Sequence, residues 1–106
     1  MGRRSPRPHP HKLAEKLRTI RARLEYSQEQ IARLLTDKAS PVHAGNISRF
    51  ERGEREPSLL VVLRYAKLAG ISTDVLIDDE RELPEHLPVV AESEWIMKRK
   101  GRRKNV

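Results

Sequence analysis

Two short segments of the chain carry side chains that could bond to nucleic acid. Residues 28–32 read Gln-Glu-Gln-Ile-Ala, and residues 46–58 begin Asn-Ile-Ser-Arg-Phe and continue through Gly53 to Pro57-Ser58. Arginine, asparagine and glutamine can hydrogen-bond to phosphate oxygens and to the edges of bases. The segments predict a short helix, a turn and a second helix that ends at the glycine.

Enzyme chemistry is not expected from this composition. The chain has no cysteine, which excludes disulfides and cysteine-ligated zinc, and it has neither a glycine-rich phosphate loop nor an HExxH segment. We therefore expect no catalytic residue, no metal and no cofactor. The longest apolar run, Leu59 to Leu63, is far too short to cross a bilayer. We expect no membrane partner and a cytoplasmic, nucleoid-associated protein.

Charge is spread unevenly along the 106 residues, whose net charge is +7. Residues 1–12 carry four basic and no acidic side chains, residues 98–106 carry six basic and no acidic ones, and residues 71–97 carry eight acids against one base. The length allows one domain. The predicted parts are a flexible basic arm at 1–10, a helical domain at 11–78, an acidic extension, extended or briefly helical, at 79–97, and a disordered basic tail at 98–106.

Five helices are expected in the helical domain, so the predicted fold class is all-α. Apolar residues recur at spacings of three and four, as one face of a helix requires. Ser27 and Gln30 form a capping box before the second helix, Ser40-Pro41 opens the third, and Gly70 closes the fourth. The predicted helices span residues 11–25, 28–35, 42–52, 59–69 and 74–77.

The order of these features resembles the Cro/phage-repressor helix-turn-helix family, often called the XRE family, over about residues 12–78. The residues that carry the resemblance are Arg21, Ser27-Gln28-Glu29, Ala32, Ile47-Ser48-Arg49, Glu51-Arg52-Gly53, Pro57-Ser58-Leu59, Ala66 and Gly70. The resemblance implies a compact five-helix bundle, to which this chain adds the basic arm and an irregular C-terminal extension. It also implies a bacterial transcriptional regulator, a repressor or autoregulator, whose third helix reads the major groove of double-stranded DNA.

Carried over residue by residue, the resemblance assigns roles within the second and third helices. Arg21 would pair with Glu51 and hold the first helix against the third. Asn46 suits adenine and Arg49 suits guanine, because each can bond bidentately to that base. The implied base contacts are His43, Ala44, Gly45, Asn46 and Arg49, and the implied phosphate contacts are Gln28, Ser48, Arg52 and Arg55.

The turn between the second and third helices departs from the family pattern. It is longer than in most members, because residues 36–42 intervene, and this leaves the start of the third helix open. Inside it, Lys38 either adds a phosphate contact or belongs to an ordinary surface loop.

The fourth helix is apolar nearly all round, which indicates burial on more than one side. In our interpretation one face serves the core of the bundle: Leu59, Val62, Tyr65, Ala66 and Ala69. The rest has no buried role: Leu60, Val61, Leu63 and Leu68. Either a second copy covers Leu60, Leu63 and Leu68 in a homodimer, which we favour because a palindromic operator would match it, or the extension does, through Leu83, Leu87, Val89, Val90, Trp95 and Ile96.

A second function remains open from these residues. The chain could be a protein-interaction module, such as the antitoxin of a toxin–antitoxin pair, that grips a partner with residues 83–97. The acidic residues around Asp78-Asp79-Glu80 are either a solvated linker or a segment that contacts the basic tail when no DNA is bound.

Overall fold

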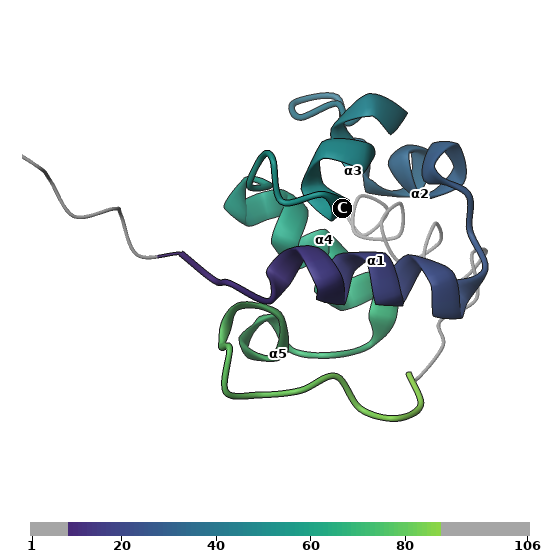
Figure 1. The fold of residues 1–106 in the computed structure, drawn as a ribbon. Coiled ribbons are helices and arrows are strands. Elements are labelled where there is room, and N and C mark those ends of the chain that lie inside the picture. Colours follow the sequence, from purple (N-terminus) through teal and green to yellow (C-terminus); the bar gives the residue numbers. More distant parts are fainter. Residues whose placement is uncertain (1–8, 88–106) are drawn as a thin grey trace, which may run out of the picture.

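Residues 9–87 are described by the computed structural model, and they form five helices (Figure 1). Within this range the β-pairing is limited to an isolated bridge between Asp37 and Ser40. The predicted all-α class and the order of the helices are therefore confirmed. The helices are α1 (Leu13–Leu24), α2 (Gln28–Leu35), α3 (Ala44–Glu51), α4 (Leu59–Ala69) and α5 (Thr73–Ile77).

The start of α2 and both ends of α4 lie where the sequence predicted them. Ser27 Oγ accepts the Gln30 N–H at 3.1 Å, and Gln30 Oε1 accepts the Ser27 N–H at 2.7 Å, which is the predicted capping box of α2. Ser58 Oγ accepts the Val61 N–H at the start of α4. Gly70, at φ 73°, ends α4 in the left-handed region that glycine adopts without a steric penalty.

The predicted start of the third helix is wrong by two residues. α3 begins at Ala44 and not at Val42, and His43 is extended, with φ −110° and ψ 160°. The reason lies in Thr36, whose hydroxyl accepts the Val42 N–H at 2.8 Å and donates to the Val42 carbonyl at 2.9 Å. Because Val42 is also buried, its backbone is held to the end of α2 and does not enter the helix.

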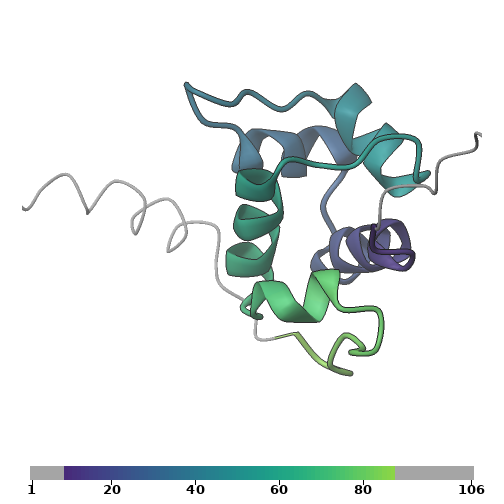
Figure 2. The ribbon, with the colours of Figure 1, turned by 90° about the vertical axis from the view of Figure 1, so that its left-hand side faces the viewer.

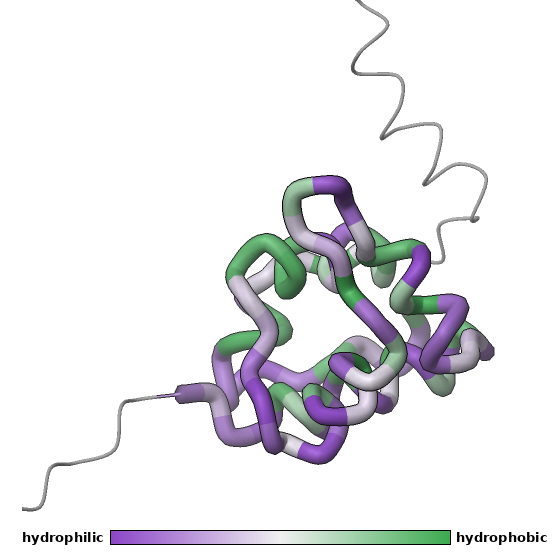
Figure 3. Tube along the Cα trace, turned by 90° about the horizontal axis from the view of Figure 1, so that it is seen from above, coloured by the Kyte–Doolittle hydropathy of each residue, from purple (hydrophilic) through white to green (hydrophobic). Residues whose placement is uncertain are grey.

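A single apolar core lies between the five helices. Leu17, Ile20, Ile31, Ile47 and Leu76 are fully buried, and they come from α1, α2, α3 and α5. Figure 3 shows hydrophobic and hydrophilic residues alternating over short distances along the trace, as in helices that bury one face. Figure 2 shows α4 running between the α2–α3 layer and α5. α4 is thus the element that joins the two ends of the core.

The predicted division of α4 into a core face and a free face is partly wrong. Leu68 is fully buried and Val61 is 4% exposed, although neither had an expected place in the core. Leu59 was expected inside and is 82% exposed. The cause is that α4 contacts α1, α2 and α5 together, so its buried face is wider than one stripe. Leu60 and Leu63 remain exposed, so they and Leu59 form an apolar patch, called here the α4 leucine patch.

The chain after α5 turns back onto α1. Asp79 accepts two backbone hydrogen bonds just before α1, and Leu83 and Leu87 pack against the core as partly buried residues. Lys16 of α1 donates to the Val75 and Asp78 carbonyls at 2.8 and 3.0 Å. Burial lowers the pKa of the Lys16 amine. The first nine residues of the predicted acidic extension therefore belong to the folded bundle.

Some predictions lie outside the described residues. They are the arm before His9, the basic tail at 98–106, and the apolar positions Val89, Val90, Trp95 and Ile96. Within residues 9–87, no helix combines the length and the apolar character that a bilayer crossing needs.

Candidate nucleic-acid interface

The pair α2 and α3 is fixed by buried side chains on both helices. Ile31 and Leu35 of α2 and Ile47 of α3 are fully buried, and α2 and α3 contact each other more extensively than any other pair of helices in the described structure. Figure 1 places this pair on one side of α1 and α5 on the other. The outer residues of α2 and α3 therefore form one surface with a rigid support.

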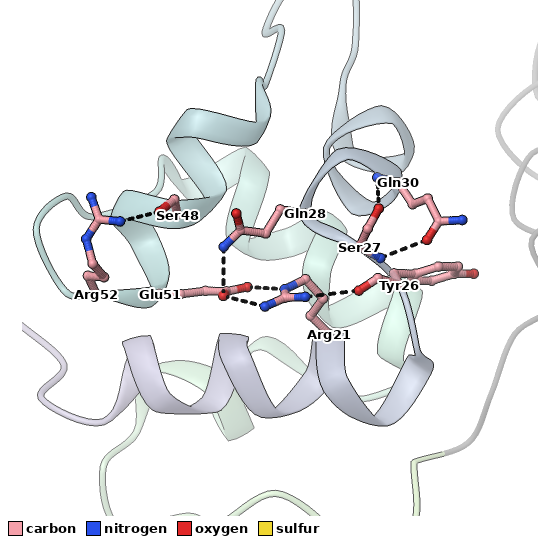
Figure 4. Close-up of polar contacts among 8 residues, drawn as sticks. All are labelled: Arg21, Tyr26, Ser27, Gln28, Gln30, Ser48, Glu51 and Arg52. Carbon is pink, nitrogen blue, oxygen red and sulfur yellow. Dashed lines mark hydrogen bonds and ion pairs between the residues drawn. The ribbon is translucent and has the colours of Figure 1, made fainter.

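Arg21 and Glu51 form a two-pronged ion pair beneath this surface (Figure 4). Arg21 Nε lies 2.6 Å from Glu51 Oε2, and Nη2 lies 2.9 Å from Oε1. Nη1 donates to the Tyr26 carbonyl at 3.1 Å. The hydrogen bond to Glu51 raises the pKa of Arg21. The pair joins α1 to the end of α3, which is the contact that the resemblance implied.

Gln28, the first residue of α2, is connected to the same ion pair (Figure 4). Its Nε2 donates to Glu51 Oε1 at 3.3 Å. A carboxylate only accepts hydrogen bonds, so this contact fixes which end of the Gln28 amide faces inward. The second N–H of Nε2 is available to an acceptor such as a phosphate oxygen. Gln28 also stands at a helix N-terminus, where the backbone favours anions.

Arg52 and Ser48 lie together at the end of α3 (Figure 4). Arg52 Nη1 donates to Ser48 Oγ, and Arg52 also pairs with Glu54 at 2.8 and 3.1 Å. The hydrogen bond raises the pKa of Arg52 and lowers the pKa of Glu54. Both side chains of the pair are more than half exposed, and exposed ion pairs are weakly held. A phosphate could therefore replace Glu54. Arg55, in the turn that follows, is exposed.

The first turn of α3 presents small and polar residues. His43 and Gly45 are exposed, and Ala44 is half-buried. Asn46 is half-buried and its Oδ1 accepts the His43 N–H at 3.0 Å, so the side chain caps the helix. Bidentate bonding to adenine needs the same oxygen. Arg49, which follows one turn later, is exposed and makes no guanidinium hydrogen bond to any residue in the range 9–87. Of the two residues expected to contact bases bidentately, Arg49 is therefore better placed than Asn46.

Sequence reasoning missed Arg64, which anchors the turn between α2 and α3. Its guanidinium contacts the Leu35 carbonyl, Asp37 and Ser40. The available signal was an arginine directly after the apolar run Leu59 to Leu63. Lys38 is exposed at the tip of this turn, between the bridged residues Asp37 and Ser40.

Within the described range, no group of three or more His, Cys, Asp or Glu side chains is arranged to hold a metal ion. The arrangement instead offers hydrogen-bond donors from two helices that share one surface, as binding to a polyanion requires.

Comparison with known proteins agrees with this geometry. No curated protein matches the chain. A family model described as a helix-turn-helix domain matches residues 12–79, which include all five helices. This domain belongs to the XRE-like group of helix-turn-helix DNA-binding domains. The chain therefore belongs to the helix-turn-helix domain family.

Proposed function

We propose that the protein is a sequence-specific regulator of transcription, a repressor or autoregulator that reads the major groove of double-stranded DNA with α3. The observation that carries the proposal is the placement of Gln28 and Arg49. Gln28 sits at the N-terminus of α2, oriented by Glu51, and Arg49 extends from the exposed side of α3. Gln28 suits a phosphate, and Arg49 suits the edge of a guanine.

The roles divide into positioning and reading. Contacts from Gln28, Ser48, Arg52, Arg55 and Lys38 to phosphates would set the orientation of α3, and they carry no sequence information themselves. Arg49 would supply the most selective base contact. Ala44 and Gly45 would act through their small size, since they let the helix approach a base pair or a thymine methyl group closely.

Binding assays on three variants test this division. Arg49→Ala should cost about 1–3 kcal/mol of binding free energy on the preferred sequence and relax the preference at one base position. Gln28→Ala should weaken binding to all sequences alike. Arg81→Ala is the matched control, because Arg81 follows α5, outside α2 and α3, and its removal changes the charge equally. Equal losses for Arg49→Ala and Arg81→Ala would contradict the proposal.

We further propose that the protein acts as a homodimer through the α4 leucine patch. The patch consists of Leu59, Leu60 and Leu63, which are 82%, 56% and 37% exposed. A two-fold dimer would cover it with the same three residues of a second copy, and would match two half-sites of a palindromic operator. Leu68, first assigned to this contact, is excluded by its burial inside the bundle.

Sedimentation of a Leu60→Gln Leu63→Gln double variant tests the dimer. The unchanged chain should sediment as a dimer, and the variant as a folded monomer. A monomer in both cases would overturn the dimer, and would favour the alternative that the C-terminal extension covers the patch.

A further inference from the structure

The turn between α2 and α3 has a defined internal structure, although it is longer than the family pattern. Thr36 Oγ1 is bonded to both backbone groups of Val42 at 2.8 and 2.9 Å. Asp37 and Ser40 exchange two backbone hydrogen bonds at 3.0 and 3.3 Å. The first contact closes the base of the turn, and the second closes its tip. Both fix residues 36–42 directly before α3 begins at Ala44.

Arg64 ties this turn to α4. Its Nη1 donates to the Leu35 carbonyl at 2.8 Å and to Ser40 Oγ at 3.4 Å, and its Nη2 donates to Asp37 Oδ2 at 3.2 Å. The Arg64 side chain is 14% exposed, so these acceptors replace most of its water. The Leu35 carbonyl belongs to the last turn of α2, where carbonyls lack a partner within the helix. One guanidinium therefore holds the end of α2 and both sides of the turn.

Arginine suits these three acceptors better than lysine does. The guanidinium is planar and directs its five N–H groups in fixed directions, whereas the lysine ammonium is a compact group with three donors. Lysine could keep the charge opposite Asp37 but could not span the Leu35 carbonyl, Asp37 and Ser40 together. The contact therefore depends on the shape of the guanidinium and on the directions of its donors, and not on its charge alone.

The remaining packing of these helices does not depend on Arg64. α2 and α3 are joined by Ile31, Leu35, Val42 and Ile47, all buried, and α4 is anchored by its own buried residues. Loss of the guanidinium should therefore leave the bundle folded and release the turn. Val42 and His43 lead directly from that turn into α3, so a released turn would let the start of α3 shift.

We propose that Arg64 is a positioning residue for DNA recognition, which holds the lengthened turn in one conformation and thereby fixes where α3 enters the major groove. The inference rests on the proposed function. Arg64 itself would touch no base. It acts through the turn on the first residues of α3, which are the residues placed to meet base edges.

Two measurements on matched variants test the proposal. The variants are Arg64→Ala, Arg64→Lys and Lys67→Ala, the last of which removes one charge from an exposed position of the same helix. Amide hydrogen exchange measures how often the turn opens, and selection from a randomised DNA pool measures base preference. Arg64→Ala and Arg64→Lys should speed the exchange of the Ser40 and Val42 amides about tenfold, because the released turn would open locally more often. Lys67→Ala should match the unchanged chain.

The base preference provides the readout that a purely structural role would not move. Both Arg64 variants should keep their helical content but bind the selected sequence about tenfold more weakly, the scale of one lost base contact. They should also discriminate less among the bases that meet the first turn of α3. Unchanged preference and unchanged exchange in Arg64→Ala would overturn the inference alone. Absence of any preference in the unchanged chain would overturn the proposed function.

If Arg64→Ala fails to fold, the contact can be tested instead by substitutions in the turn between α2 and α3. An Asp37→Ala Ser40→Ala double variant leaves the core untouched and removes both side-chain acceptors of Arg64. It should reproduce the faster exchange at Val42 and the weaker discrimination. Retention of both wild-type values would contradict the positioning role.

Discussion

Asp79, which follows α5, caps the N-terminus of α1 through a hydrogen bond from the Lys12 N–H to Asp79 Oδ1 at 3.0 Å. The His11 N–H donates to Oδ2 of the same carboxylate at 2.9 Å. Helix α1 has no side-chain cap of its own at Lys12. A residue 67 positions away thus accepts the N–H of the N-cap residue Lys12, as the Glu or Gln of a capping box does in other helices.

Removing this carboxylate should destabilise the bundle at neutral pH. Asp79→Ala leaves the His11 and Lys12 N–H groups without their acceptor, so its melting temperature should fall below that of the unchanged chain. Glu80→Ala is the matched control, because it removes the same charge from the exposed neighbouring position. Thermal melts followed by circular dichroism compare the two. Equal melting temperatures for the two variants would refute the capping role.

The contribution of Asp79 should depend on pH. The backbone hydrogen bonds from His11 and Lys12 lower the pKa of Asp79 from its ordinary value of 3.8. A lowered pKa in the folded state means that the stabilisation is fully present above the unfolded value and is lost as the pH falls through the folded value. The difference in melting temperature between Asp79→Ala and the unchanged chain should therefore be constant near neutrality and shrink below about pH 4. A difference that grows on acidification would contradict the contact.

The buried hydroxyl of Tyr65 should contribute nothing to stability. Tyr65 is fully buried, and its hydroxyl makes no hydrogen bond to any residue between His9 and Leu87. Burial raises the pKa of this phenol well above its usual range. A buried polar group without a partner costs about 1–3 kcal/mol, so Tyr65→Phe should fold with equal or greater stability in urea titrations. Tyr65→Leu, which removes the ring, should be clearly less stable. A marked loss in Tyr65→Phe would show that the hydroxyl has a partner.

The Arg21–Glu51 pair should matter far more than the exposed Arg52–Glu54 pair. The Glu51 side chain is 5% exposed and that of Arg21 is 22% exposed. Removal of one partner from a buried pair costs about 3–5 kcal/mol, because the other charge stays buried. Glu51→Ala should approach that range in chemical denaturation, and Glu54→Ala should leave stability unchanged. Gln28 would also lose its orientation in Glu51→Ala, so DNA binding should weaken even in samples that remain folded.

Gly45 should show opposite effects on stability and on DNA binding. A Cβ at this position would meet no atom within 4 Å, so alanine fits the free protein. Alanine should raise the free energy of unfolding by up to about 1 kcal/mol, since glycine is a poor helix former. If α3 approaches DNA closely there, the added methyl group should weaken binding and alter base preference. Parallel denaturation and binding assays decide this, and a stabilised variant with unchanged binding would remove Gly45 from the interface.

Local signals predicted the helices well, because each depends on a few adjacent residues. The Ser27–Gln30 capping box, the Ser58 cap and the Gly70 stop all act within one turn of the chain. The start of α3 was misplaced because Thr36 holds Val42 through a contact six positions apart, which competes with the nearby Ser40-Pro41 signal. The hydrogen bonds between Thr36 and Val42 therefore moved the start of the helix to Ala44.

The candidate site could be predicted only where the family pattern extends. Arg21 and Glu51 pair in the structure, as the resemblance implied, and Gln28 joins them through a contact with Glu51 that was not predicted. Arg64 and Asp79 act at separations of 24 to 29 and of 67 to 68 positions, which helical periodicity does not report. The burial of Leu68 depends on how many helices α4 contacts, and that number is a property of the assembled bundle.

Selection of bound fragments from sheared genomic DNA tests the central proposal most directly. The salt concentration should be about 150 mM, because non-specific phosphate binding weakens there. We expect an inverted repeat whose half-sites lie about 10 base pairs or a multiple apart, as a dimeric reader of the major groove requires. Fragments without a shared sequence would contradict a sequence-specific regulator, and would direct attention to a protein partner.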